Sequence, residues 1–271
     1  MNNPVLKYDI KIRLRISKLI TALALRYAFA GFLVLLVLLL QLGTGILAFI
    51  IAEVVLISLT APGIVCDAFN SRSGRDSLIE LSLTKLGARS IIFGRFMASL
   101  FYNEIFVLLS AIIMIMIVLI RHSSSGVLGI LYASVALFIV NFALSVTGML
   151  LVTIFRRNLL ISSVLAYAII LLLLGSVIIV GPFMERIKSQ QAKDAITKAA
   201  LYANPVIMVS RSLGKVDILR TQYLYNLADP IVGRGFTYPD TFASWIVYFG
   251  VSCLMLAIAM AFSPQTFFQL F

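Results

Sequence analysis

Two apolar stretches follow each other almost without a break: ALALRYAFAGFLVLLVLLLQL at residues 22–42 and GILAFIIAEVVLISLTAPGIVC at residues 45–66. A helix that crosses the hydrocarbon core of a bilayer needs about 20 mainly apolar residues, and both stretches reach that length. Because only Gly43 and Thr44 separate them, they predict a hairpin of two antiparallel membrane-spanning helices. A basic segment precedes the first stretch, as in a signal peptide, but the immediate second stretch favours the hairpin.

The remaining sequence contains four more stretches of this kind, at residues 96–120, 127–155, 159–183 and 242–262. The composition agrees, since 61% of the 271 residues are hydrophobic and 12% are charged. A soluble domain carries about 25% charged residues, so this composition excludes soluble enzymes. Disordered chains, which need low hydrophobicity and high net charge, are excluded as well. We therefore predict an all-α integral membrane protein with six transmembrane helices.

The distribution of Lys and Arg predicts the orientation in the inner (cytoplasmic) membrane. Residues 1–26 contain six of these residues, residues 67–95 contain five and residues 156–157 contain two, whereas the short turns on the other side contain only Arg121. Basic residues in short loops mark the cytoplasmic side. Both termini, including the tail at residues 263–271, are therefore predicted to be cytoplasmic, with residues 184–240 outside. That long outer segment carries eight basic and five acidic residues, and long segments carry less weight in this rule.

Residues 1–21 predict a helix that lies in the membrane interface. At 100° per residue, Lys7, Lys11, Arg15 and Lys18 share one narrow stripe, which suits a basic face turned toward anionic lipid headgroups. Asp9 and Arg13 lie four residues apart in the apolar arc, where they are expected to pair. A strand is the alternative, because residues 10–16 alternate between apolar and basic side chains, but a lone strand would leave backbone groups unpaired in the interface.

Two longer segments between the predicted spans require packing of their own. The cytoplasmic segment at residues 67–95 begins with turn formers and then contains a short apolar helix at residues 78–86, ended by Gly87. Exposed apolar residues on such a helix indicate a protein partner on the cytoplasmic side. The external segment at residues 184–240 begins with a helix that ends at Asn204-Pro205. Its later tyrosines predict that it folds against the outer membrane face, where an external partner could bind.

The chain lacks the residues that catalysis or nucleotide binding would require. His122 is its only histidine, so it offers neither a histidine-based metal site nor a catalytic triad. It also has no Gly-x-x-x-x-Gly-Lys-Ser/Thr loop for ATP phosphates. We expect no enzyme activity and no cofactor in this chain itself. The net charge of +11 is concentrated near the cytoplasmic ends of the spans, which indicates lipid contact and not nucleic-acid binding.

Two acidic residues, Glu53 and Glu104, lie within predicted spans. Acids inside a membrane face a partner or a water-filled cavity, because an isolated charge there is costly. Each residue either contacts a substrate or ion in a pathway or forms an interhelical hydrogen bond. For Glu53 both interpretations stay open. For Glu104 we expect a structural role, in which it pairs with Arg95 or another basic group.

Residues 78–95 read LIELSLTKLGARSIIFGR. They resemble a signature of the permease subunits of ABC-2 type transporters, which has the form TLELLLTPLSPREIVxGK between the second and third spans. Lys85 stands where the family has proline, and Arg95 stands where it usually has lysine. The opening residues 3–6 and the plan of six spans are similar to that family too. The matching positions, in register without a gap, are Glu80, Leu81, Leu83, Thr84, Leu86, Arg89, Ile91 and Gly94.

The resemblance implies that residues 71–87 form a cytoplasmic coupling helix bound in a groove of a separate ATP-binding cassette ATPase. The chain would then be the membrane subunit of an ATP-driven exporter, dimerising with a second copy or a paralogue, with ATP and Mg held by the ATPase. A non-transporting ABC membrane subunit that transmits force to an external partner through residues 184–240 is the alternative. The residues implied to contact the ATPase are Arg72, Arg75, Asp76, Leu78, Glu80, Leu81, Leu83, Lys85 and Arg89.

Overall fold

The computed structural model describes residues 3–13, 16–39, 45–70, 86–120, 124–155, 158–184, 186–214, 218–219 and 238–268. Within these ranges all regular secondary structure is α-helical. The helices are α1 (Pro4–Arg13), α2 (Ile16–Leu39), α3 (Ile46–Asn70), α5 (Ala88–Ile120), α6 (Ser124–Phe155), α7 (Leu159–Leu174), α8 (Ser176–Met184), α9 (Gln190–Ala203), α10 (Pro205–Leu213) and α12 (Thr241–Phe268).

Among the described residues, α3, α5, α6 and α12 are long and apolar enough to cross a membrane. Helices α7 and α8 together meet the same criterion, although they are bent by 64° at the break between them. Helix α2 contains a shorter apolar stretch, Ile20–Leu36. Four or five helices of this length fit a multi-pass membrane protein, the class that the sequence predicted, while the layout of six spans stays a prediction.

The fifth predicted span, residues 159–183, is not one straight helix. Helix α7 ends at Leu174, Gly175 follows, and α8 starts in a new direction at Ser176. The amide of Asn204 donates to the Leu174 carbonyl at 2.8 Å, and the Ser176 hydroxyl donates to the Ala200 carbonyl at 3.0 Å. Kinks occur where glycine or an inserted polar side chain interrupts the helical ladder. Contacts with the following segment therefore accompany the bend.

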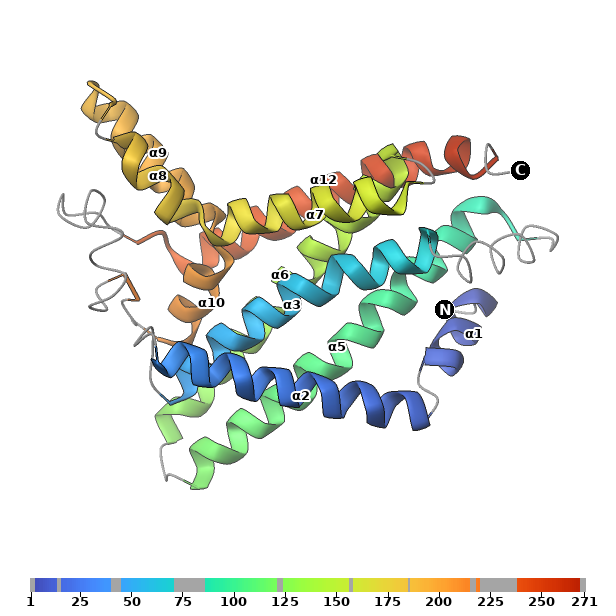
Figure 1. The fold of residues 1–271 in the computed structure, drawn as a ribbon, viewed down its shortest axis with the longest axis horizontal. Coiled ribbons are helices and arrows are strands. Elements are labelled where there is room, and N and C mark those ends of the chain that lie inside the picture. The colour runs from blue at the N-terminus through green and yellow to red at the C-terminus, as the bar shows by residue number, and fades with distance from the viewer. Residues whose placement is uncertain are drawn as a thin grey trace.

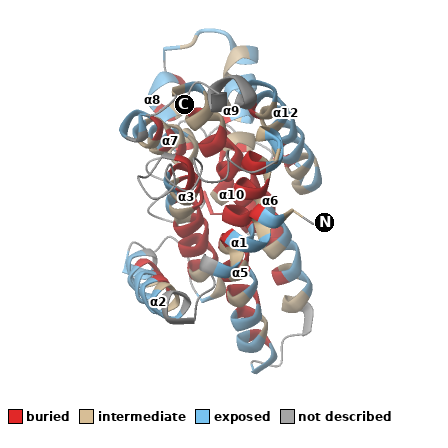
Figure 2. Cartoon of the chain, turned by 90° about the vertical axis from the view of Figure 1, so that its right-hand side faces the viewer, coloured by how far each residue is buried: buried red, intermediate tan, exposed pale blue. Residues whose placement is uncertain are grey.

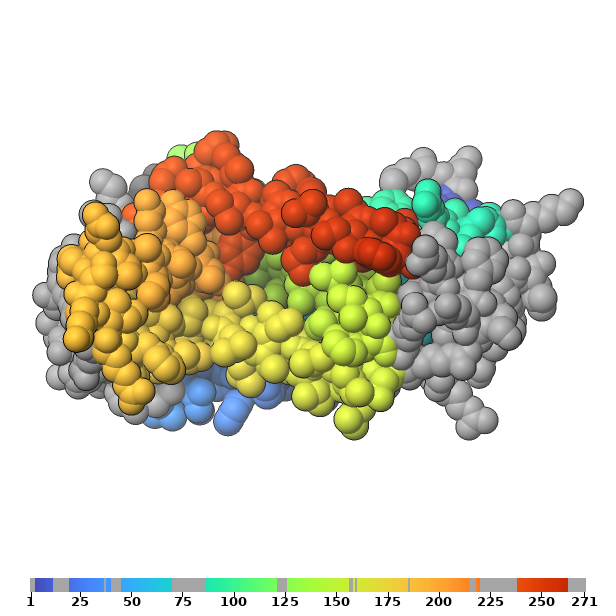
Figure 3. Space-filling model, turned by 90° about the horizontal axis from the view of Figure 1, so that it is seen from above, coloured from blue at the N-terminus to red at the C-terminus, as the bar shows by residue number. Residues whose placement is uncertain are grey.

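The helices form an elongated bundle with two different ends (Figure 1). Helix α1, the last turns of α3, the first turns of α5 and the end of α12 lie at one end, while α8, α9 and α10 lie at the other. Seen from above, α12 and α7 cover one face, with part of α6 visible between them (Figure 3). Chain segments that are far apart in the sequence are thus brought together at each end.

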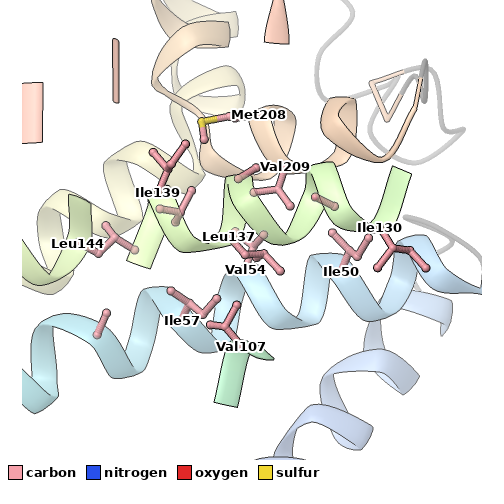
Figure 4. Packing of buried hydrophobic residues seen from close by; sticks show 14 of the residues in the cluster. Ile50, Val54, Ile57, Val107, Ile130, Leu137, Ile139, Leu144, Met208 and Val209 are labelled. Carbon is pink, nitrogen blue, oxygen red and sulfur yellow. The ribbon is translucent and has the colours of Figure 1, made fainter. Parts of the chain in front are cut away.

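Helix α6 forms the centre of the bundle and has no charged residue. It packs against α3, α5, α10 and α12. Figure 4 shows the main apolar cluster, in which Leu137 of α6 lies beside Val54 of α3, Ile130 lies beside Ile50, and Val209 of α10 covers the other side of α6. Lipid tails are as apolar as these side chains, so close van der Waals packing is what holds these helices together. Buried residues are concentrated in this central layer, whereas α2 lies at the periphery (Figure 2).

A helix, α9, follows the fifth predicted span; it runs from Gln190 to Ala203, with Asn204 as its C-cap. The sequence predicted that the segment after this helix folds against the outer membrane face. Helix α10 instead packs among the long helices α3, α6 and α12. Met208 and Val209 of α10 are buried in the apolar cluster of α3 and α6, whereas Ile207 packs against Val177 of α8 and Leu201 of α9. The approach is close enough that a Cβ on Gly129 would lie 2.2 Å from the Leu213 carbonyl oxygen. Glycine at this position of α6 therefore allows α10 to pack there.

The predicted interfacial helix at residues 1–21 corresponds to two elements. Helix α1 ends at Arg13, and α2 begins at Ile16, so residues 16–20 belong to the apolar helix that follows. Asp9 pairs with Arg95, 86 positions along the chain, at 3.2 Å. The local pairing with Arg13 was predicted from spacing alone, and the side chain of Arg13 lies outside the described residues. Helix α1 therefore docks on α5 through its one acidic residue.

Candidate functional site

Glu53 lies near the middle of α3 with its side chain completely buried. Its Oε2 accepts a hydrogen bond from the guanidinium of Arg26 in α2 at 3.0 Å, and its Oε1 accepts one from the Ser110 hydroxyl in α5 at 2.7 Å. Both carboxylate oxygens thus have a partner on a neighbouring helix. A buried ion pair is tolerated when its remaining hydrogen-bonding positions are filled in this way.

Arg26 is only 7% exposed and connects α2 to two other helices. Besides Glu53, it donates to the Asn103 side-chain oxygen at 3.1 Å. Its guanidinium carbon also lies 4.9 Å from the centroid of the Phe106 ring, an arrangement that favours a cation. Arg26 was counted among the cytoplasmic charges in the sequence, but it lies inside the helix bundle. This buried arginine is the most informative residue that the sequence analysis missed.

A chain of side-chain amides continues from this ion pair to Glu104. The Asn103 amide donates to the Asn141 side-chain oxygen, and the Asn141 amide donates to Oε1 of Glu104. All three residues are buried, and Asn141 belongs to α6, which has no charged residue. The expected pair between Glu104 and Arg95 is therefore not formed, because Arg95 lies two and a half turns away and bonds elsewhere.

We call these residues the membrane network: Arg26, Glu53, Asn103, Glu104, Ser110 and Asn141. The network joins α2, α3, α5 and α6. Polar groups in a membrane interior are rare and face other polar groups, so each bond fixes the relative positions of the two helices that it joins. The charges of Arg26 and Glu53 balance, whereas Glu104 is held by an amide. The network can therefore fix the register of these helices.

A second polar cluster, the end junction, lies where α1 meets α3 and α5. The Arg95 Nε bonds to Asp9 at 3.2 Å, and its terminal nitrogen donates to the Ala68 carbonyl at 3.1 Å. The Asn3 amide donates to the Ser90 carbonyl at 2.8 Å. A Cβ on Gly94 would lie 2.7 Å from the Asn3 amide nitrogen, so glycine there allows the close contact. The junction ties the last turn of α3, the first turns of α5 and α1 into one unit.

The residues implied to contact an ATPase fall mainly in residues 71–85, outside the described residues. These are Arg72, Arg75, Asp76, Leu78, Glu80, Leu81, Leu83 and Lys85. Only Arg89 is described, and it lies exposed on the first turn of α5. The end junction lies on both sides of this segment in the sequence, with Ala68 before it and Ser90 and Arg95 after it. Within the described ranges, no group of three His, Cys, Asp or Glu side chains could hold a metal ion.

A third polar group joins α10 to the bundle at the opposite end. Trp245 of α12 donates to the Ser212 hydroxyl at 3.1 Å, and Arg211 lies over the Tyr238 ring at 4.6 Å from its centroid. The Asn204 side chain caps α10 by accepting from the backbone amides of Val206 and Ile207. The cap at Asn204 could be read from an Asn-Pro pair that precedes an apolar run, but the insertion of α10 left no signal in the sequence.

Comparison with known proteins adds no assignment to this geometry. No protein-family model matches the chain, and no curated protein sequence matches it.

Proposed function

We propose that the chain is the permease subunit of an ATP-driven ABC exporter of the ABC-2 type. A separate ATPase subunit would hydrolyse ATP and bind the cytoplasmic segment at residues 71–87. The resemblance of residues 78–95 to the family signature supports this assignment. The same proposal predicts that two permeases pair, so that closure of two ATPases moves them as rigid bodies and opens a path between them.

The observation that carries the proposal is the end junction on either side of the proposed coupling segment. That segment leaves α3 after Asn70 and joins α5 before Ala88. Arg95 is bonded to both Asp9 and the Ala68 carbonyl, so a force on the segment would act on α1, α3 and α5 together. A movable loop without such bonds would deform instead of moving the helices. The junction therefore provides the stiffness that mechanical coupling requires.

The membrane network would carry the same motion further into the bundle. Glu53 on α3 and Asn103 on α5 bond to Arg26 on α2, and Asn141 brings α6 into the connection. A displacement of α3 and α5 at the cytoplasmic end would thus be passed to α2 and α6. Packed side chains and hydrogen-bond networks are the physical means by which such coupling travels.

The proposal uses six spans, with α2 as the first and the bent pair α7 and α8 as the fifth. Helix α1 and the end of α12 lie at the same end of the bundle, which fits an even number of crossings with both termini in the cytoplasm (Figure 1). The basic residues of the first segment and of the segment between α3 and α5 support the cytoplasmic location of that end. Helices α8 to α10 would then lie on the outer side.

A second candidate function is force transmission to an external partner without transport. Helices α8 and α9 pack against each other and project beyond the end of the bundle, while α10 inserts into it (Figure 1). A partner bound to α9 would therefore be connected through α10 to α3, α6 and α12. This arrangement allows motion of the spans to reach the outer surface.

The decisive experiment is purification of the tagged full-length chain from its native membranes, followed by mass spectrometry of the copurified proteins. The proposal expects an ATP-binding cassette ATPase in stoichiometric amount. It also expects the double variant Glu80→Lys/Leu81→Asp to reduce the ATPase at least tenfold. A matched control, Ile196→Asp/Lys198→Glu at two exposed positions of α9, should retain the ATPase. Absence of an ATPase, or equal retention in both variants, would reject the assignment.

Reconstitution of the complex into vesicles distinguishes the two candidate functions. An exporter is expected to show ATPase activity that rises at least severalfold when its substrate is present, together with ATP-dependent movement of that substrate. A force-transmitting subunit is expected to respond to a protein bound on the outer face, with no solute moved.

A further inference from the structure

A groove with an apolar wall lies between α1 and the outer face of α5. Its volume is about 290 Å³. This is at the lower limit of pockets for small organic ligands, so it suits a single hydrocarbon chain better than a bulky molecule. The lining residues are Ile10, Ala98, Phe101, Tyr102, Glu104, Ile105 and Leu108.

The groove opens on the face of α5 that is turned away from the bundle. Phe101 is 46% exposed and Leu108 is 62% exposed, and both belong to the apolar part of a membrane-length helix. From Ala98 to Leu108 the helix rises by about 15 Å, so the groove follows roughly half the thickness of the hydrocarbon core. An acyl chain of one leaflet covers the same depth.

One end of the groove is formed by a helix that presents positive charge. Helix α1 directs Val5 and Asp9 toward α5 and places Ile10 in the groove. Lys7 and Lys11 are exposed, and at 100° per residue they lie about 60° and 100° around the helix from Ile10. Because Asp9 is already paired with Arg95, it does not neutralise these lysines. The end of the groove thus combines an apolar channel with two cationic side chains that form no ion pair with any described residue.

We propose that this groove binds one anionic phospholipid of the membrane leaflet in which α1 lies. One acyl chain occupies the groove between α1 and α5, and the phosphate meets Lys7 and Lys11. Charge complementarity favours this occupant over the outer faces of α5, α6 and α12 in a second copy, on which no acidic side chain is exposed among the described residues. A zwitterionic lipid would fill the groove but gain less from the lysines. The site lies beside Glu104 and does not depend on an ATPase.

Native mass spectrometry of the purified full-length protein tests this site. The protein is released from nanodiscs that contain equal amounts of phosphatidylglycerol and phosphatidylcholine with identical acyl chains, and the retained lipids are counted. We expect one tightly retained phosphatidylglycerol. Each basic residue near an anionic surface contributes about fivefold in affinity, so Lys7→Gln/Lys11→Gln should weaken retention about 30-fold. Both side chains are exposed, so folding should be unaffected.

Two further variants separate the site from general charge and from dimer formation. Lys188→Gln/Lys198→Gln removes two exposed lysines, one just before α9 and one on it, at the far end of the bundle, and should retain the lipid. Ile10→Trp fills the groove from α1 without altering charge and should abolish retention of either lipid. Equal retention of both lipids by the unaltered protein overturns the proposal. So does an Ile10→Trp variant that keeps its lipid but loses a dimer, since a second copy would then occupy the groove.

Discussion

The membrane network and the end junction each contain a buried arginine that bonds to a carboxylate, yet their surroundings differ. Arg26 and Glu53 meet deep among the long helices, and a hydroxyl fills the second oxygen of Glu53. Arg95 and Asp9 meet at the end of the bundle, where Arg95 also bonds to a backbone carbonyl. The Glu53 side chain is fully buried, whereas that of Asp9 is 9% exposed at the end of the bundle, so desolvation is more complete for the first pair. Similar ion pairs should therefore contribute unequally to stability.

The largest effect is expected for Glu53→Leu, which leaves Arg26 buried without its counter-charge. Removing one member of a buried ion pair costs about 3–5 kcal/mol. Helix α2 packs mainly against α3, so it should separate from the bundle first. The measurement is the free energy of unfolding in detergent. Thiol labelling of an added Ala30→Cys substitution detects exposure of the α2–α3 contact. The double variant Arg26→Met/Glu53→Leu should recover most of the loss, and no recovery would contradict the ion-pair explanation.

Asn141→Leu removes the amide that joins α6 to Glu104 and Asn103. A buried polar group left without a hydrogen bond costs about 1–3 kcal/mol, so we expect the free energy of unfolding to fall by an amount in that range. Asn141→Asp keeps the size and supplies only acceptors, and it places a second acid beside Glu104. That variant should be less stable than Asn141→Leu when unfolding is followed at neutral pH. The reverse order would show that shape, and not hydrogen bonding, matters at this position.

Asp9→Ala should have a smaller effect. It should weaken the docking of α1 on α5 by about 1.5 kcal/mol, because a hydrogen bond to a charged group is lost while Arg95 keeps its bond to the Ala68 carbonyl. The main consequence is local, since α1 contacts the rest of the described structure chiefly through α5. We expect faster proteolysis within residues 3–13 at an almost unchanged unfolding midpoint. Global destabilisation comparable to that of Glu53→Leu would remove the distinction between the two ion pairs.

The smallest effect is expected for Gly94→Ala. Its new Cβ would meet the end of the flexible Asn3 side chain, which can rotate away, so we expect a change below about 1 kcal/mol. Gly129→Ala provides the contrast, because its Cβ would meet the Leu213 backbone carbonyl, which cannot move without shifting α10. Thermal unfolding of the two variants side by side measures the difference. Equal destabilisation would show that α1 is held as rigidly as α10.

The sequence predicted the helical membrane class because apolar length is a local property that a bilayer converts directly into helices. The end of α9 could likewise be read locally, from Asn204 and Pro205. The hydrogen-bond partners of Glu53 and Glu104 could not be predicted from the local sequence. Arg26 lies 17 residues before Gly43 and Glu53 lies 10 residues after it, so a simple hairpin would not pair them. Their contact depends on how α2 crosses α3.

By itself, the sequence therefore determined that this protein lies in a membrane, where long apolar helices alternate with short basic segments. Tertiary structure alone decided that Arg26 is a buried partner of Glu53, that Asp9 reaches Arg95, and that α10 inserts between the long helices. Helix formation follows from burial of the chain in hydrocarbon, residue by residue. The partner of a polar side chain depends instead on the relative depth and crossing of two helices, which many distant contacts set together.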